Sequence, residues 1–187
     1  MLERSQISLN RIAYPNIGLE EFLKLASELN LSKVELRNDL PGGQVVDGME
    51  AERVCELAER HGISIITINA LQRFNLAGNL SRALEELEEL LALAVSIRCP
   101  AIVLCPVNDN RDARDSRRRY EETVGCLQKY APLLEEAGVM GDLEPLGFRD
   151  SSLASLITAQ KAIEESAARC YRLLYDTFHS HIGPDGS

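Results

Sequence analysis

The stretch Ile63-Ser-Ile-Ile-Thr-Ile-Asn69 is rich in β-branched residues, almost continuously apolar, and ends in a polar amide. Strands that face solvent on one side alternate apolar and polar residues, whereas strands covered on both faces do not. This stretch therefore predicts a strand of a parallel sheet with helices on both faces. The residues before it, Met49 to His61, have helical apolar spacing, and Gly62 is a natural helix end. His61 is expected to have a structural role there, because a positive charge is favourable at that end of a helix.

The same alternation continues in both directions along the chain. Strands are expected at residues 6–10, 33–36, 101–105, 139–144 and 171–175, and helices at residues 18–29, 80–97, 117–137 and 152–166. Ser151 or Ser152 is expected to cap the last of these helices, and no helix is expected after the sixth strand. Residues 38–48 form the main irregular connection and could act as a mobile lid. Strict alternation implies parallel strands with right-handed crossovers, as in an open doubly wound sheet or a barrel.

The strand ends favour the barrel. The turn from Asn10 to Gly18 lacks the glycine-rich pattern with which a doubly wound fold binds a nucleotide phosphate. Polar side chains instead end nearly every strand, and barrel active sites are built from such strand ends. We therefore predict an α/β fold, a parallel (β/α)8 TIM barrel, with about six βα units in residues 1–187 forming a single incomplete domain. The polar strand-end residues are Asn10, Glu35, Arg37, Asn38, Asn69, Cys105, Asn108, Glu144, Asp176 and His179.

Composition excludes several classes of protein. The net charge of −9 opposes nucleic-acid binding, and the basic run Arg117 to Arg119 is interpreted as a solvated helix start. No apolar run approaches the length of a membrane span, and the N-terminus does not resemble a secretory signal. The five cysteines form no Cys-x-x-Cys pair, which indicates reduced thiols in a cytoplasmic protein. Four are expected in the core, whereas Cys105 lies at a strand end.

Two carboxylates are the strongest candidates for chemistry. Glu144 and Asp176 each follow apolar, strand-like residues, where a carboxylate is partly desolvated unless a cation or donor satisfies it. With an imidazole from His179 or His181 they suit a divalent metal such as Mn, Mg, Co or Zn. The cation could polarise a substrate carbonyl and its neighbouring hydroxyl while a carboxylate moves a proton between adjacent carbons. His179 is preferred, because in an extended segment only one of the two histidines faces the site.

Each candidate also has a structural interpretation. Glu144 could form a salt bridge with Arg37, and Asp176 could cap a helix. Glu35 and Arg37 share one face of their strand, so they could bind substrate or pair with each other. Asn10 and Asn69 could bind substrate hydroxyls or satisfy backbone groups where strands end. These alternatives remain open from the sequence.

These residues lie in motifs that resemble a known family. The motifs are Ile7-Ser-Leu-Asn10, Lys33-Val-Glu-Leu-Arg-Asn-Asp39, Thr67-Ile-Asn-Ala-Leu71, Val103-Leu-Cys-Pro-Val-Asn-Asp109, Leu143-Glu-Pro-Leu-Gly-Phe148 and Asp176-Thr-Phe-His179. They resemble the xylose isomerase-like TIM-barrel superfamily, the sugar phosphate isomerase and epimerase group, and within it most closely the inosose (2-keto-myo-inositol) isomerases. The likeness covers essentially the whole chain.

The resemblance implies a role for each matching residue. Glu144 and Asp176 match the metal ligands that end strands five and six, Glu144 also being the possible base, and His179 matches a residue beside the substrate. The family's other two ligands are a histidine from strand seven and a glutamate from strand eight, and the sequence has neither strand. We therefore expect these residues to be a fragment of a longer protein. The alternatives are that another chain supplies the missing strands, or that the protein is degenerate and does not catalyse. Proposed substrate contacts are Asn10, Glu35, Arg37, Asn69, Asn108, His179 and His181.

The expected activity is isomerisation of an inosose through an enediol, in carbohydrate metabolism and inositol catabolism. A sugar epimerase, a hydroxypyruvate isomerase or an inosose dehydratase of the same superfamily is the alternative within enzymes. A non-catalytic barrel remnant that binds a sugar-like ligand is the alternative outside them. The expected partner is a small polyol or keto-sugar, without nucleic acid or membrane, and a homo-oligomer is left open. An endonuclease is disfavoured, because only three histidines are present and the charge repels DNA.

Overall fold

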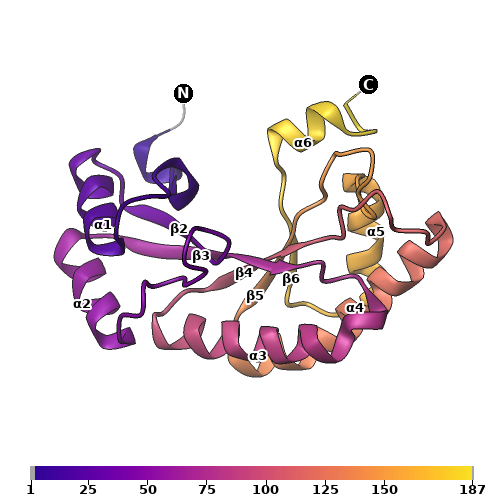
Figure 1. Cartoon of the computed structure of the whole chain (residues 1–187), viewed down its shortest axis with the longest axis horizontal. Helices are drawn as coiled ribbons and strands as arrows, with labels where there is room; N and C mark the ends of the chain where they lie inside the picture. The colour runs from indigo at the N-terminus through magenta and orange to yellow at the C-terminus, as the bar shows by residue number, and fades with distance from the viewer. Residues whose placement is uncertain (1–2, 187) are drawn as a thin grey trace. The chain divides into compact units, whose positions relative to one another are not determined.

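The computed structural model describes residues 3–186. Its strands alternate with helices along the chain, as the colour gradient of Figure 1 shows. The strands are β1 (Leu9–Asn10), β2 (Lys33–Arg37), β3 (Ser64–Gln72), β4 (Ala101–Cys105), β5 (Met140–Leu143) and β6 (Tyr171–Leu173). The α-helices are α1 (Leu19–Glu28), α2 (Ala51–His61), α3 (Leu80–Ser96), α4 (Ser116–Ala137), α5 (Leu156–Ser166) and α6 (Thr177–Ile182). Short 3-10 turns are η1 (Arg4–Gln6), η2 (Arg11–Ala13) and η3 (Ala77–Asn79).

The strands form one sheet in the order β1-β2-β3-β4-β5-β6. The pairs β1–β2, β2–β3 and β5–β6 are parallel, with Asn10 opposite Glu35 and Arg37 opposite Asn69. The α/β class and the six βα units are therefore confirmed. The sheet order equals the chain order, as expected when each strand is followed by a crossover helix.

Three local predictions were wrong. The helix α6 follows β6, where an extended segment was expected, because the Asp176 side chain caps it by accepting from the backbone N of His179. The first strand is short, since η1 occupies its expected beginning. Ser155, rather than Ser151 or Ser152, caps α5 by accepting from the backbone N of Thr158.

The described chain divides into two compact units. The first comprises residues 3–70 and 92–102. Its helix α1 buries Leu19, Phe22, Leu23 and Ala26, whose spacing places them on one helical face. Strand β2 contributes Val34 and Leu36 to the same unit's core, and both are fully buried.

In this unit, hydrogen bonds from Arg11 hold the loop 38–48 near its C-terminal end. The buried guanidinium of Arg11 donates to the Val45 carbonyl at 2.9 Å and to both Asp47 carboxylate oxygens at 2.7 Å. Asp47 also accepts from the backbone N of Leu19, at the start of α1. The expectation that this loop closes over a substrate stays a prediction.

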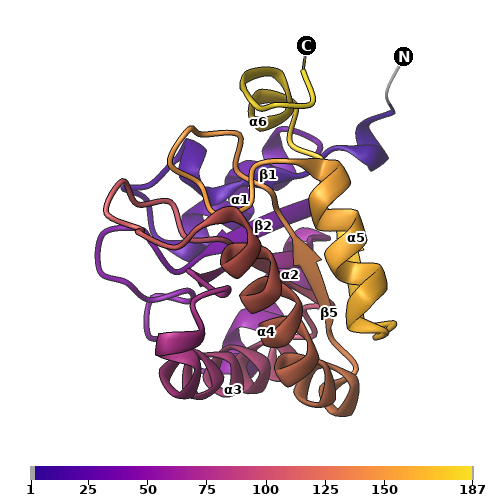
Figure 2. The same ribbon diagram turned by 90° about the vertical axis from the view of Figure 1, so that its right-hand side faces the viewer.

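The second unit comprises residues 71–91 and 103–186. Its core contains Phe74, Leu104 and Tyr130, all fully buried. The Tyr130 hydroxyl donates to the Phe74 carbonyl at 2.7 Å, and the Tyr171 hydroxyl donates to the Leu127 carbonyl at 2.6 Å. Burial raises the pKa of both phenols, so they remain hydrogen-bond donors. The helices α4 and α5 of this unit lie side by side (Figure 2).

The cysteines are free thiols. Cys99, Cys126 and Cys170 are buried as predicted, and Cys105 is buried as well. The prediction for Cys55 was wrong, because this residue is only half-buried. Throughout residues 3–186, no helix combines the length and the apolar character that crossing a membrane requires.

Candidate metal centre

Glu144, Asp176 and His179 come together in the second unit. Each offers one ligand atom, and these atoms all lie within 4.8 Å of one another. Glu144 directly follows β5, is only 9% exposed, and its backbone N donates to the Leu104 carbonyl at 3.1 Å. Parallel pairing of β5 with β6 brings both carboxylates to the same edge of the sheet.

The helix α6 determines which histidine joins the carboxylates. Asp176 and His179 are three residues apart, so they share one face of the helix, whereas His181 points elsewhere and is exposed. The expected extended geometry, in which His179 and His181 alternate, is wrong, although His179 is still the histidine near the carboxylates. Asp176 is a helix cap, as its structural interpretation foresaw, with an oxygen 2.8 Å from the His179 backbone N. A carboxylate has two oxygens, so capping leaves capacity for a cation.

The imidazole of His179 is held between aromatic rings. The centroids of Phe148 and Phe178 lie 4.8 and 5.3 Å from its own, both edge-on. Its Nδ1 atom is buried and has no hydrogen-bond partner within the described part of the chain. A buried polar atom without a partner is costly, and such an atom points to a missing ligand.

The donor set fits a divalent cation. Two carboxylates and an imidazole are ligands that Mn, Co and Zn accept. A cation relieves the convergence of like charges from Glu144 and Asp176, and the unpartnered nitrogen of His179 is satisfied by the cation or by a bound substrate.

The loop between β5 and α5 supports this centre. Figures 1 and 2 show α6 beside this loop. A side chain at Gly147 would clash with the backbone carbonyl of His179, so glycine is needed for the close approach. The same loop supplies Phe148, which packs on the His179 ring.

The thiol of Cys105, at the end of β4, also contacts the centre. Its Sγ donates to Oε2 of Glu144 at 3.4 Å. The sequence placed Cys105 among the polar strand ends, but it could not show that the thiol meets this carboxylate.

The candidate residues of the first unit have definite partners. The Asn10 amide donates to Oε1 of Glu35 at 3.0 Å and accepts from the backbone N of Ile12. Arg37 donates to both Asp39 oxygens at 2.7 and 2.6 Å, and its guanidinium lowers the pKa of that carboxyl. Asp39 was not foreseen as its partner.

The side-chain amide of Asn69 has fewer hydrogen bonds than the side chains of Asn10 and Arg37. Asn69 is 6% exposed, and its Oδ1 finds no hydrogen-bond partner among residues 3–186. Its backbone carbonyl accepts from the backbone N of Asn38, so the backbone group is satisfied separately. A role of the Asn69 side chain in substrate binding stays a prediction.

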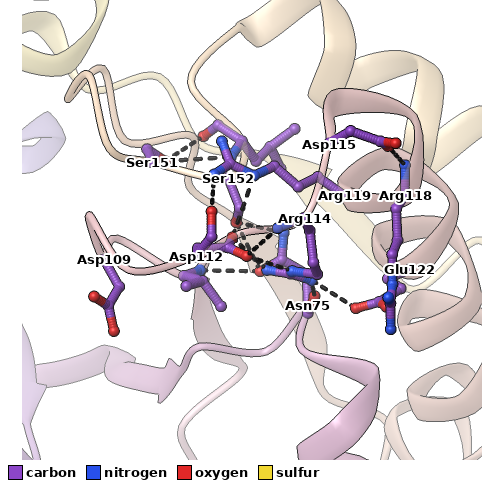
Figure 3. A network of polar contacts seen from close by, with 12 residues as sticks. Asn75, Asp109, Asp112, Arg114, Asp115, Arg118, Arg119, Glu122, Ser151 and Ser152 are labelled. Carbon is purple, nitrogen blue, oxygen red and sulfur yellow. Dashed lines mark hydrogen bonds and ion pairs between the residues drawn. The ribbon is translucent and has the colours of Figure 1, made fainter.

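A polar network joins the loops that follow β3, β4 and β5 (Figure 3). Asn75 is fully buried and donates to Thr123 and Ser152, while its Oδ1 accepts from the backbone N of Val107. Asn108, an expected substrate contact, is exposed and forms an isolated bridge with Ser151. The network was missed from the sequence because its partners are 32 to 77 residues apart.

An ion cluster holds the loop before α4 (Figure 3). Arg114 binds Asp112 at 2.9 Å and Glu122 at 2.6 Å, and all three side chains are at most 12% exposed. Arg119 binds Asp112 as well and Arg118 binds Glu122, so the basic run Arg117 to Arg119 is not simply solvated. Hydrogen bonds from Arg114 lower the pKa of Asp112, against the opposing effect of burial.

This cluster predicts acid-sensitive stability. The folded pKa of Asp112 lies below its ordinary value of 3.8, so its stabilising contribution is complete above that pH and is lost as the pH falls through the folded pKa. We expect the free energy of unfolding to fall between pH 5 and pH 2, and to fall less in Asp112→Asn. Urea denaturation across this range tests it. Asp109, whose pKa hydrogen bonds from Arg111 lower to about 2, should keep part of the dependence in the variant. An identical slope in both proteins would contradict the assignment.

The family model of the xylose isomerase-like TIM barrel matches residues 23–187. A xylose isomerase domain containing protein from Salmonella typhimurium LT2 is 37% identical, with a TM-score of 0.88 over 97% of this chain. The IolI protein with a bound zinc atom superposes with a TM-score of 0.85 over 96% of the chain at 18% identity. D-psicose 3-epimerase in the presence of D-fructose gives 0.78 over 95% at 13% identity.

The chain spans 64% of the length of the Salmonella structure and 65% of each of the other two. The search of curated proteins finds no significant match. The family model covers most of the chain, and the fold and strand order agree with it. The chain belongs to the xylose isomerase-like TIM barrel family.

Proposed function

We propose that the chain carries part of the active site of a metal-dependent isomerase acting on a small polyhydroxy ketone, with an inosose as the first candidate substrate. The observation that carries this proposal is the convergence of Glu144, Asp176 and His179. The zinc atom of the IolI structure and the epimerase among the structural neighbours support the same chemistry.

Glu144 and Asp176 would hold the cation, which when bound would polarise a carbonyl and the hydroxyl beside it. Glu144 then takes a proton from the hydroxyl-bearing carbon, and the C–H electron pair forms the C=C bond of an enediol as the carbonyl π pair moves onto its oxygen. Return of the proton to the neighbouring carbon, with transfer of the hydroxyl proton between the two oxygens, gives the isomeric ketone or aldehyde. His179 contacts the substrate from its aromatic setting beside the two carboxylates.

The related reactions differ in one step. An epimerase returns the proton to the opposite face of the same carbon, and a dehydratase expels a neighbouring hydroxyl from the enediol. The same three side chains serve all of them, so a panel of inososes and ketoses, analysed for product structure, is the experiment that separates them. The remaining substrate contacts, Asn10, Glu35, Arg37, Asn69, Asn108 and His181, are proposals of the same kind.

Cation titration tests the centre directly. We expect the chain to bind Mn²⁺ or Zn²⁺ stoichiometrically in calorimetry, and Asp176→Asn to weaken the affinity by more than about a hundredfold, because even outer partners of a metal site are worth 10 to 100-fold. Asparagine caps helices as well as aspartate does, so α6 should persist. Asp150→Asn, in the loop after β5, is the matched control and should bind normally. Equal affinity in Asp176→Asn and wild type would overturn the metal assignment.

A further inference from the structure

The thiol of Cys105 lies against the carboxylate of Glu144 in a buried setting. Cys105 is the last residue of β4 and is 5% exposed, and Glu144 directly follows β5, its neighbour in the sheet. Their backbones are also linked, because the Glu144 N donates to the Leu104 carbonyl. The Sγ to Oε2 distance of 3.4 Å is that of a hydrogen bond from sulfur. Two strand ends therefore fix both members of the pair.

This contact differs from the hydrogen bonds that the thiols of Cys99 and Cys170 donate. Cys99 and Cys170 donate to backbone carbonyls, of Ala101 and Ala131 respectively. Neither of these bonds reaches a member of the group of three ligand atoms. The bond from Cys105 instead reaches a titratable side chain that belongs to the group of three ligand atoms.

A carboxylate that binds a cation must have its oxygens in a definite plane. Residues that hydrogen-bond to a metal ligand commonly fix the orientation of that plane. A donor on Oε2 restricts rotation of the Glu144 carboxylate and lowers the entropy lost when a cation binds. We propose that Cys105 is a positioning residue that orients Glu144 for the cation. This inference rests on the proposed function, in which Glu144 is a ligand.

Three substitutions separate orientation from packing. Cys105→Ala removes the donor, Cys105→Ser keeps a donor of similar size, and Cys170→Ala removes a thiol that is also 5% exposed but bonds to the backbone. Mn²⁺ and Zn²⁺ affinities of the 187-residue chain are measured by calorimetry, and thermal unfolding without metal reports the packing loss. We expect about tenfold weaker cation binding in Cys105→Ala. This is the lower end of the roughly 10 to 100-fold range for residues that hydrogen-bond to a metal ligand, because a thiol is a weak donor.

Cys105→Ser should recover most of the affinity, and Cys170→Ala should match wild type in affinity while losing stability comparable to that lost by Cys105→Ala. Should Cys105→Ala fail to fold, Cys105→Val removes the donor while filling the space. Equal affinities in Cys105→Ala and Cys170→Ala, or no recovery with serine, would overturn the positioning role while leaving the metal centre standing. A wild-type chain that binds neither cation would instead overturn the proposed function, and this inference with it.

Discussion

Replacing Glu144 with Gln is expected to lower turnover by about a thousandfold or more, since the substitution removes both a cation ligand and the proton-transferring group. Glutamine keeps the length and shape of the side chain, and its carbonyl oxygen can still accept from the Cys105 thiol. The fold should therefore remain intact, as checked by circular dichroism and thermal unfolding. Because the chain carries only part of the proposed active site, turnover is measured on the inosose and ketose panel in saturating Mn²⁺ with the variant placed in a protein that also contains strands seven and eight of the barrel.

Glu136→Gln is a matched control, because Glu136 is an exposed glutamate of α4 outside the centre. It should leave turnover unchanged. Saturating metal matters, because a variant that only binds the cation weakly would recover activity under that condition, whereas one that lacks the base would not. Unchanged turnover in Glu144→Gln would end the assignment of this residue to the reaction.

The alternation of strands and helices was predictable, because a strand that helices cover on both faces has a nearly continuous apolar sequence. Ile63 to Asn69 is such a case, and β3 begins one residue later than predicted, at Ser64, and continues to Gln72. The places of Glu144 and Asp176 followed from the same logic, since Glu144 directly follows β5 and Asp176 comes three residues after the end of β6. Their convergence depends on the pairing of β5 with β6, which the family resemblance implied and the structure shows.

The sequence did not predict which of several neighbouring serines caps α5. The segment 151–155 contains three serines, and each can cap a helix. Ser152 is engaged by Asn75 and Ser151 by Leu153, which leaves Ser155 for α5. The choice thus depends on tertiary bonds that no local pattern records.

The helix α6 was missed for a related reason. It has only six residues and no apolar stripe that is buried, so its sequence lacks the periodicity by which helices are recognised. Its beginning depends on one hydrogen bond, from the His179 backbone N to Asp176. The same bond places His179 near the carboxylates. Asp176 is therefore both the cap of α6 and a candidate metal ligand.

Asn75→Ala is expected to destabilise the chain by about 3–5 kcal/mol, because several buried polar partners lose their bonds at once and each costs about 1–3 kcal/mol when left unsatisfied. Its amide bonds Thr123 and Ser152 at 2.9 Å, and the backbone N of Val107 donates to its Oδ1 at 2.9 Å. Such a loss is a large part of the typical stability of a domain. Urea denaturation gives the free energy of unfolding, with Asn110→Ala, in an exposed position after β4, as the control.

The stability loss should carry a second effect on the centre. Asn75 links the loop after β4 to the loop after β5, and the latter supplies Phe148 against the His179 ring. Under conditions where Asn75→Ala is still folded, its cation affinity should therefore fall together with its stability, whereas Asn110→Ala should change neither. If Asn75→Ala lowers the free energy of unfolding by less than about 1 kcal/mol, water replaces the amide without strain. The network would then not be what stabilises the loops after β3, β4 and β5.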